Sequence, residues 1–286
     1  MSIILAIRKV LILPLLIITL LTTPAAVSTE SAELLSTDTF VFEQALMMGQ
    51  GITNDGEYYY TSGSITAVNT QTLAKFDMDM NFVKANINPL PKVCKQRGNN
   101  HIGGISYYDG KIYAPVEGGD EVYACIVVFD ADTLKATGEI YDLPNEDYGD
   151  GVPWCAVDPQ TGYLYASIWD ETKVIHVYDV NDGMKLVKDI TLTGAQVKRI
   201  QGAEFYEGTL YLSKDNNHDG EIRQILKVDV DTGAVSVFAE RNVGSEDIEA
   251  EGMTITKDEN GPVFHVLDYN RAIGVFVHHY KLNAVA

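Results

Sequence analysis

Short apolar stretches alternate with turn residues along the chain, and the arrangement repeats about every fifty residues. Each repeat has an apolar stretch, a turn that contains Asp, Glu or Gly, and an aromatic-rich stretch. The five repeats are QGITNDGEYYYTSGS (50–64), GGISYYDGKIYAPVE (103–117), WCAVDPQTGYLYASIW (154–169), QGAEFYEGTLYLSKD (201–215) and EGMTITKDENGPVFHVLD (251–268). Their first residues are separated by 53, 51, 47 and 50 positions, a period typical of one blade of a β-propeller.

A second hairpin follows in each repeat, because further apolar runs flank turn residues such as Asn181, Asp182 and Gly183. These signals predict four strands per repeat. The predicted fold is therefore all-β, a five-bladed β-propeller with four-stranded blades. A twisted solenoid is the alternative for a repeat of this length.

The fifth repeat reaches Ala286 before it can form a fourth strand. We predict that the extended stretch 39–46, which precedes the first repeat, supplies this strand. Closure of the ring by the opposite end of the chain would also remove the exposed edges of an open sheet.

The first residues have the features of a targeting segment. Arg8 and Lys9 precede the apolar run 10–21, and the small residues of 22–28 suit signal-peptidase cleavage. We predict a secretory signal peptide over 1–28 and a single propeller domain over 29–286, secreted to the extracellular space or the periplasm. The apolar run is short for a membrane span of about 20 residues, although a signal anchor is the alternative. After cleavage we expect no membrane association, and we expect a monomer.

The chain is strongly acidic. Its formal net charge is −19, and removal of Arg8 and Lys9 with the signal peptide brings it to −21. Such a surface repels nucleic-acid backbones and anionic lipids, so we expect no nucleic-acid partner. The charge favours cations, or it serves solubility alone.

Three cysteines are present, at 94, 125 and 155. One disulfide is compatible with an oxidising compartment. We expect Cys94 to pair with Cys125, because Cys155 falls inside a predicted buried strand.

Alignment of the repeats brings polar residues into columns at one end of the predicted ring. The first strand of each blade begins at Gln50, Gly103, Trp154, Gln201 and Glu251, and two positions earlier stand Met48, His101, Val152, Arg199 and Glu249. The second strand ends at Ser64, Glu117, Trp169, Asp215 and Asp268. The longer loops gather at the same end, so we place the functional site there.

Several carboxylates in one small volume would raise one another's pKa unless a positive group lies among them. Calcium fits this chemistry best, since it prefers carboxylate and amide oxygens. The predicted calcium ligands are Glu249, Glu251, Gln201, Asp215 and Asp268. Arg199 is the alternative partner for Glu251, which would make these acids a structural ion-pair network.

Other residues of the columns are candidates for catalysis and ligand binding. We predict His101 or Glu117 as general base and a catalytic role for Glu251. The predicted ligand-binding residues are Trp154, Trp169, Arg199 and Gln50. The tryptophans suit stacking on a ring or a sugar, with core packing as the alternative, and His101 can equally be a structural hydrogen-bonding residue.

The strand openings KRIQGAEF, EAEGMTI and GQGIT resemble those of calcium-activated nucleotidases and of plant-type glutaminyl cyclases, both five-bladed propeller enzymes. The six-bladed gluconolactonase and strictosidine-synthase group shares the idea of an axial metal. The resemblance covers the repeats over most of the chain, but each motif is three or four residues long.

The function that these features favour is a secreted hydrolase. Its axial calcium ion would polarise a small-molecule ester, lactone or phosphoanhydride. A non-catalytic propeller that binds a ligand or a glycan is one alternative. A cyclase or isomerase with a protonated carboxyl group in the channel is another.

Overall fold

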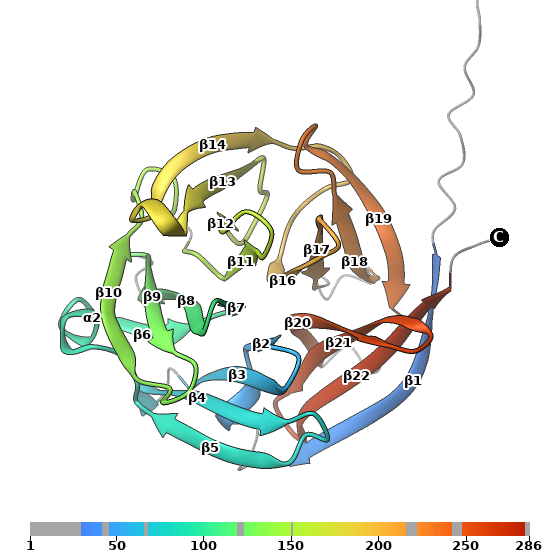
Figure 1. Cartoon of the computed structure of the whole chain (residues 1–286), viewed down its shortest axis with the longest axis horizontal. Coiled ribbons are helices and arrows are strands. Elements are labelled where there is room, and N and C mark those ends of the chain that lie inside the picture. The colour runs from blue at the N-terminus through green and yellow to red at the C-terminus, as the bar shows by residue number, and fades with distance from the viewer. Residues whose placement is uncertain are drawn as a thin grey trace, which may run out of the picture.

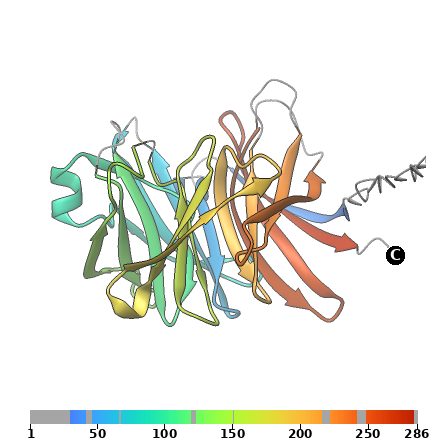
Figure 2. The same ribbon diagram turned by 90° about the horizontal axis from the view of Figure 1, so that it is seen from above.

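The computed structural model describes residues 30–41, 46–65, 68–118, 123–149, 151–215, 222–241 and 248–283. In these residues the chain forms five antiparallel blades around a central axis (Figure 1), which confirms the predicted five-bladed β-propeller. Viewed edge-on, the strands of each blade run from one face of the disc to the other (Figure 2). The predicted signal peptide, 1–28, lies outside the described residues.

Each blade is a meander whose first strand lies innermost. Blade 1 contains β2 (Gly51–Asn54), β3 (Tyr58–Ile65), β4 (Thr70–Asp77) and β5 (Phe82–Ile87). Blade 2 contains β6 (Asn99–Ile102), β7 (Ser106–Tyr108), β8 (Lys111–Gly118), β9 (Cys125–Asp130) and β10 (Ala136–Asp142). Blade 3 contains β11 (Trp154–Asp158), β12 (Tyr163–Ser167), β13 (Val174–Asp179) and β14 (Lys185–Thr191).

Blade 4 contains β16 (Ile200–Tyr206), β17 (Thr209–Lys214), β18 (Arg223–Val228) and β19 (Ala234–Arg241). Blade 5 contains β20 (Ile248–Asp258), β21 (Gly261–Asn270), β22 (Gly274–Asn283) and β1 (Glu30–Val41). The short elements are α2 (Lys92–Gln96), η2 (Val180–Asp182) and β15 (Thr193–Gly194). No helix among the described residues is long and apolar enough to cross a membrane.

The N-terminal strand β1 completes blade 5, as predicted. It runs antiparallel to β22, from Ser31 opposite Asn283 to Val41 opposite Gly274. The observed strand begins and ends earlier in the sequence than the predicted stretch 39–46, because β1 pairs with β22 over the whole length of β22. Residues 42–45 of the predicted strand lie outside the described residues. At its start β1 also pairs with β19, which links blade 5 to blade 4.

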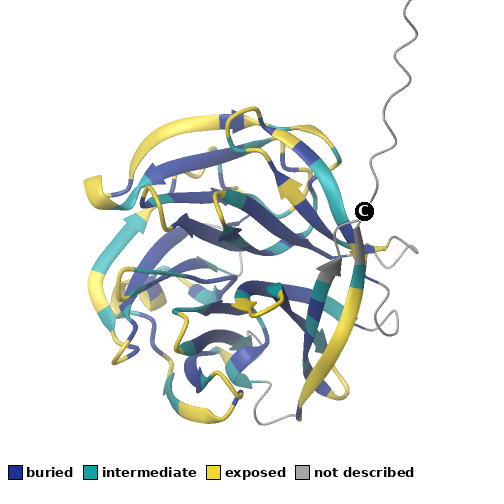
Figure 3. Ribbon diagram, turned by 45° about the vertical axis from the view of Figure 1, so that its right-hand side comes forward, coloured by how far each residue is buried: buried dark blue, intermediate teal, exposed yellow. Residues whose placement is uncertain are grey.

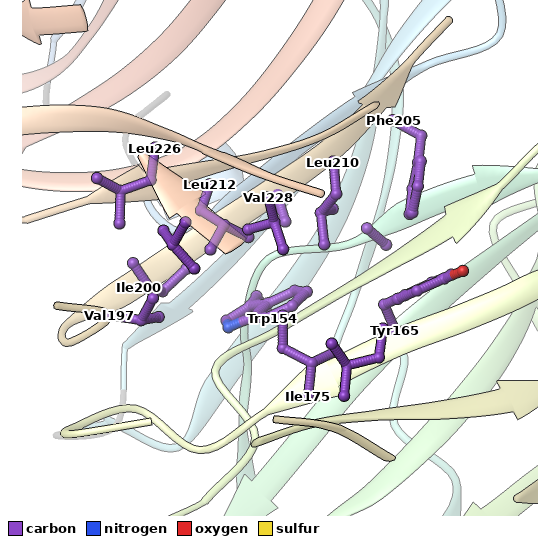
Figure 4. Packing of buried hydrophobic residues seen from close by; sticks show 14 of the residues in the cluster. Trp154, Tyr165, Ile175, Val197, Ile200, Phe205, Leu210, Leu212, Leu226 and Val228 are labelled. Atoms are coloured by element: carbon purple, nitrogen blue, oxygen red, sulfur yellow. The ribbon is translucent and has the colours of Figure 1, made fainter. Parts of the chain in front are cut away.

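The hydrophobic core is divided among the five interfaces between neighbouring blades. The described buried apolar side chains form five clusters, each drawn from two adjacent blades. Between blades 3 and 4, for example, Trp154 and Ile175 pack against Phe205 and Leu212 (Figure 4). The inner strands are buried, whereas much of the outermost strands is exposed (Figure 3). Each blade is thus held mainly by its two neighbours.

The three cysteines are buried free thiols, so the predicted disulfide is not present. Cys94 of α2 and Cys125 of β9 nevertheless lie in the same cluster between blades 1 and 2. A hydrogen bond between their side chains lowers the pKa of Cys94 and raises that of Cys125. Cys155 is buried in β11 as predicted, and burial raises its pKa.

The innermost strands touch one another through glycines at the axis. The N–H group of Gly252 donates a hydrogen bond of 2.8 Å to the carbonyl of Gln50. A Cβ atom on Gly252 would lie 2.7 Å from Cα of Gly51, and one on Gly202 would lie 2.6 Å from Cα of Gly252. These contacts are backbone against backbone, so only glycine fits them.

The same constraint explains why the innermost strand of blade 2 is split into β6 and β7. Gly103 and Gly104 separate the two segments, and the N–H group of Gly104 donates to the carbonyl of Pro153 over 2.7 Å. A Cβ atom on Gly103 would lie 2.1 Å from that carbonyl oxygen. The chain therefore leaves its own sheet at this point to pair with blade 3.

Substitution of an axial glycine should destabilise the ring. We expect Gly252→Ala to lower the free energy of unfolding by about 1–3 kcal/mol, because the added methyl group would clash with the rigid backbone of the neighbouring strand. Gly149→Ala is the matched control, since its Cβ atom would lie 3.5 Å from the nearest neighbour. Urea unfolding of the two variants measures the difference, and equal midpoints would contradict the axial contact.

Candidate functional site

Strand register brings the polar columns together at one end of the axis, which we call the axial mouth. His101 lies opposite Glu117 in blade 2, and Ala250 lies opposite Asp268 in blade 5. The starts of the innermost strands and the ends of the second strands therefore share one rim, as predicted. Glu246 and Asp247, which precede β20 in the sequence, lie outside the described residues.

Four side chains from three blades form a connected polar group across the mouth, which we call the axial cluster. Nε2 of Gln50 donates to Oε1 of Glu251 over 3.2 Å, and Oε1 of Gln50 is hydrogen-bonded to Nε2 of His101. Nδ1 of His101 lies 3.1 Å from Oε1 of Glu117, at ion-pair distance but out of line for a hydrogen bond. Glu117 is fixed in turn by the N–H group of Val152, which donates to its Oε2 atom over 2.6 Å.

Glu251 is the most perturbed carboxyl group of this cluster. It is 2% exposed, and this burial raises its pKa well above the ordinary value. The carboxylates of Glu249, Asp215 and Asp268 raise the pKa further, whereas the guanidinium of Arg199 lowers it. Burial and the neighbouring carboxylates therefore favour the protonated form of Glu251, the form that can donate a proton.

Asp215 is neutralised by two arginines. Nη2 of Arg199 donates to its Oδ2 atom over 2.7 Å, and Nε of Arg223 lies 3.5 Å from Oδ1. The N–H group of Ala250 donates to the same Oδ1 atom over 2.9 Å. Asp215 is fully buried, and these positive groups make its burial possible. The sequence analysis named Arg199 as a partner for Glu251, but it missed the pairing of Arg199 with Asp215 and the contribution of Arg223.

Arg199 is held in an unusual backbone conformation. Its φ angle is 53°, in the left-handed region that costs a non-glycine residue about 1 kcal/mol or more. The N–H group donates to the carbonyl of Trp169 over 2.7 Å, and the carbonyl accepts from the N–H group of Asp215 over 3.0 Å. The guanidinium lies 4.4 Å from the centre of the Trp169 ring. Arg199 and Trp169, both predicted ligand-binding residues, thus form one cation–π pair at the mouth.

Asp268 belongs to a second buried ion-pair group. Arg241 donates to its two oxygens over 2.9 and 3.0 Å, and Nδ1 of His278 lies 2.7 Å from Oδ2. Burial alone would raise the pKa of Asp268, but Arg241 and His278 lower it below the ordinary value. The Arg241 side chain is itself fully buried and lies over the ring of Tyr280.

These pairings change the predicted calcium site. Asp215 and Asp268 direct their oxygens at arginines, so they are not open to an ion. Three predicted ligands stay at the axis without an arginine bonded to them, namely Glu249, Glu251 and Gln201, and Nε2 of Gln201 donates to Oε1 of Glu249 over 3.2 Å. In the described part of the chain, no three His, Cys, Asp or Glu side chains are arranged to hold a metal ion.

The two tryptophans have different environments. Trp154 is fully buried between blades 3 and 4 (Figure 4), which does not fit its predicted contact with a ligand and corresponds to the alternative of core packing. Trp169 is partly exposed and borders the mouth through Arg199. Of the two, Trp169 is the one that can contact a ligand.

Glu204 is a half-buried acid that sequence reasoning missed. Its carboxylate accepts from Thr53 of blade 1 and Thr254 of blade 5, over 3.4 and 3.0 Å. Burial raises its pKa to about 7, although these hydroxyl groups oppose the shift. The repeat alignment could have identified Glu204, because it lies two residues after the axial Gly202. The other blades have Thr53, Ser106, Val157 and Thr254 at this position.

A cavity of about 290 Å³ lies between two loops of blades 3 and 4. It is lined by residues 171–173, after β12, and residues 192–197, before β16. None of the predicted site residues contributes to it. We therefore assign the candidate site by its convergent polar groups and not by this cavity.

Comparisons with known proteins reveal relatives by fold alone. The chain matches no protein-family model, and no curated protein matches its sequence. A GH43 endo-arabinanase from Bacillus licheniformis is 14% identical, with a TM-score of 0.56 over 86% of this chain and 97% of the arabinanase. A luciferin-regenerating enzyme is 9% identical, with a TM-score of 0.50 over 82% of this chain and 75% of that enzyme.

The tail fibre of Staphylococcus aureus phage P68 is also similar. It is 14% identical, with a TM-score of 0.55 over 88% of this chain. The chain spans only about half of that fibre, 52% of its length. At these identities the similarities establish a shared propeller fold and leave the reaction open.

Removal of the Asp268 carboxylate should destabilise the protein. We expect Asp268→Asn to cost about 3–5 kcal/mol, because Arg241 would stay buried with an unpaired charge. Glu207→Gln is the control, since it removes the exposed pair with Lys257 and should change stability little. An Asp268→Asn protein as stable as the unmutated one in chemical unfolding would contradict the importance of this buried ion pair.

Proposed function

We propose that the protein is a hydrolase of small molecules whose active site is the axial mouth. The observation that carries the proposal is Glu251, a buried carboxyl group with a raised pKa that is connected through Gln50 to a histidine–carboxylate pair. Perturbed acids next to a potential base are typical of acid–base catalysis. The fold shared with enzymes such as the GH43 arabinanase and the luciferin-regenerating enzyme is compatible with this role.

In the proposed reaction Glu251 is the general acid and protonates the leaving group. The His101–Glu117 pair supplies the general base that removes a proton from water, and Gln50 connects this pair to the acid. After the leaving group departs, the base returns its proton to water and Glu251 regains one from water, so both groups are restored. A positioned acid and base each contribute about 10²–10⁴-fold in rate.

A calcium ion is the alternative to a protonated Glu251 at the same site. Glu249, Glu251 and Gln201 would hold the ion with the amide oxygen of Gln50, since these are hard oxygen donors without a bonded arginine. The ion would supply polarisation of a carbonyl or phosphoryl oxygen. Glu251 would then be ionised and serve as a ligand, so binding of calcium and proton donation by Glu251 exclude each other.

Esters, lactones and phosphoanhydrides are the proposed substrates, and secretion is proposed from the predicted signal peptide. The arabinanase among the similar structures adds the glycosidic bond, which also needs an acid and a base. A non-catalytic propeller is the second candidate. It is favoured by the Trp169–Arg199 pair, which offers an aromatic surface and a cation at the mouth without requiring any reaction.

Loss of the acid should abolish turnover without unfolding the protein. Against a panel of lactones, esters, nucleotides and arabinan, we expect Glu251→Gln to lower kcat by about 10²–10⁴-fold. The fold should persist, because glutamine has the shape of glutamate and its uncharged amide suits this buried position. Glu259→Gln, at an exposed glutamate, should keep full activity. Hydrolysis at the original rate by Glu251→Gln would exclude the assigned acid, and binding without turnover by the unmutated protein would favour the binding propeller.

Calcium should raise the melting temperature of the chelator-treated protein. An ion at about 100 times its Kd adds about 2.7 kcal/mol to the stability of the folded state. We expect Glu249→Gln to abolish the rise and Glu204→Gln, on the other side of the axial glycines, to keep it. A melting temperature unaffected by chelation would remove calcium from the proposal and leave the protonated Glu251 as the acid.

A further inference from the structure

A second chain of polar side chains crosses blade 5 on the face that packs against blade 1. It consists of Thr256, His265, His279 and Asp38, and we call it the histidine chain. Oγ1 of Thr256 is 2.7 Å from Nε2 of His265, Nδ1 of His265 is 2.5 Å from Nδ1 of His279, and Nε2 of His279 is 3.0 Å from Oδ2 of Asp38. The hydroxyl of Tyr59, from blade 1, also lies 3.2 Å from Nε2 of His265.

Strand alternation explains why these residues share one face. His265 and His279 are a direct cross-strand pair of β21 and β22. Val275 and Val277 lie on the same face of β22 as His279 and pack into the apolar cluster between blades 5 and 1. His278 points the other way, to Asp268, as successive side chains of a strand must. The histidine chain is thus separate from the ion pairs at the mouth.

The carboxylate of Asp38 fixes the tautomer of both histidines. Because it can only accept, Nε2 of His279 must donate, which leaves Nδ1 of a neutral His279 as an acceptor. Nδ1 of His265 therefore donates to it. Nε2 of His265 is then an acceptor for the hydroxyl groups of Thr256 and Tyr59. These tautomers connect the four side chains while both imidazoles are uncharged.

Protonation of this chain places a charge in a buried site. A proton added to Nδ1 of His279 would set two N–H groups face to face 2.5 Å apart. A proton added to Nε2 of His265 could be accepted by a hydroxyl oxygen, but it would leave a buried cation. Burial and the neighbouring His279 accordingly lower the pKa of His265 to about 3, and His265 is only 6% exposed.

The titratable groups facing His265 come from three elements. β22 contributes His279, β1 contributes Asp38 beyond it, and β3 contributes Tyr59, whose pKa burial raises to about 12. The strand β20 contributes the uncharged hydroxyl group of Thr256 to the histidine chain. Asp38 is the only one of these with a carboxylate, and it bonds to His279 and not to His265. Protonated His265 would therefore be a buried cation without a direct counter-charge.

The histidine chain also spans the junction that closes the ring. Thr256, His265, His279 and Asp38 come one each from β20, β21, β22 and β1, the four strands of blade 5. β1 is joined to the rest of the disc mainly by its pairing with β22, and its pairing with β19 is confined to Glu30 and Ser31. We propose that the histidine chain is an acid-sensitive latch, which holds β1 in the ring when both imidazoles are neutral and releases it on protonation.

The direction of the pH effect follows from the lowered pKa of His265 in the folded protein. An imidazole exposed by opening takes up a proton below about pH 6.5, whereas the closed state resists this uptake. The stability of the closed state is therefore complete above pH 6.5 and is lost as the pH falls. For one proton the opening equilibrium shifts by at most about tenfold per pH unit.

Hydrogen exchange of the backbone amides in β1 tests the latch. We expect protection factors, corrected for intrinsic exchange rates, to fall up to tenfold per pH unit between pH 6.5 and 4.5 in residues 32–41 and much less in β13. His265→Gln, which cannot become protonated, should abolish this local fall. His176→Gln should keep it, because His176 is a matched buried histidine, 2.8 Å from Asp189 in blade 3 and outside the latch.

An unchanged pH response in His265→Gln, or protection of β1 that does not vary with pH, would overturn the proposal. An NMR titration of the imidazoles in the unmutated protein gives an independent test should that variant fail to fold. We expect the folded protein to keep His265 neutral down to pH 4.5. A folded-state titration of His265 near pH 6.5 would overturn the latch.

Discussion

The close approach of the innermost strands at the axis is the constraint on which the rest of the structure depends. Gly51, Gly104, Gly202 and Gly252 let strands of four blades meet without side chains between them. These glycines pack the innermost strands against one another, and the apolar clusters fill the wider space between the blades farther from the axis. The centre of the ring is therefore held by backbone contacts that a single methyl group would disturb.

This central contact also divides the polar residues of the axis into two groups. Glu251 and its partners lie at the mouth, before the glycines in sequence, and Glu204 follows its glycine by two positions. Desolvation raises the pKa of both carboxyl groups, although Glu251 is buried and Glu204 is half-buried. Their surroundings differ, because Glu251 is connected through Gln50 to a histidine and lies near further carboxylates, whereas Glu204 accepts from hydroxyl groups. Of the two, Glu251 is the one connected to a potential base.

The sequence predicted the parts of the structure that repeat. A period near fifty residues was enough to predict the number of blades, the closing strand and the shared rim of Glu117, Asp215, Asp268 and Glu251. The burial of Trp154 and the partners of the acids were harder to predict. Arg223 and Arg241 lie on β18 and β19, outside the aligned columns, and reach Asp215 and Asp268 only after the blades fold. Alignment of repeats identifies residues at equivalent positions, but it says nothing about side chains that enter from other strands.

Blade 5 carries buried polar groups on both of its faces, and its assembly offers a physical reason. Its strands come from both ends of the chain, so nothing in the local sequence fixes the register of β1 on β22. A slip of one residue would turn every side chain of β1 to the opposite face and would separate Asp38 from His279. Buried ionic and hydrogen-bonded groups add little net stability, but they can select one register over another. The same contact that would make the closure sensitive to acid therefore also penalises a misaligned closure.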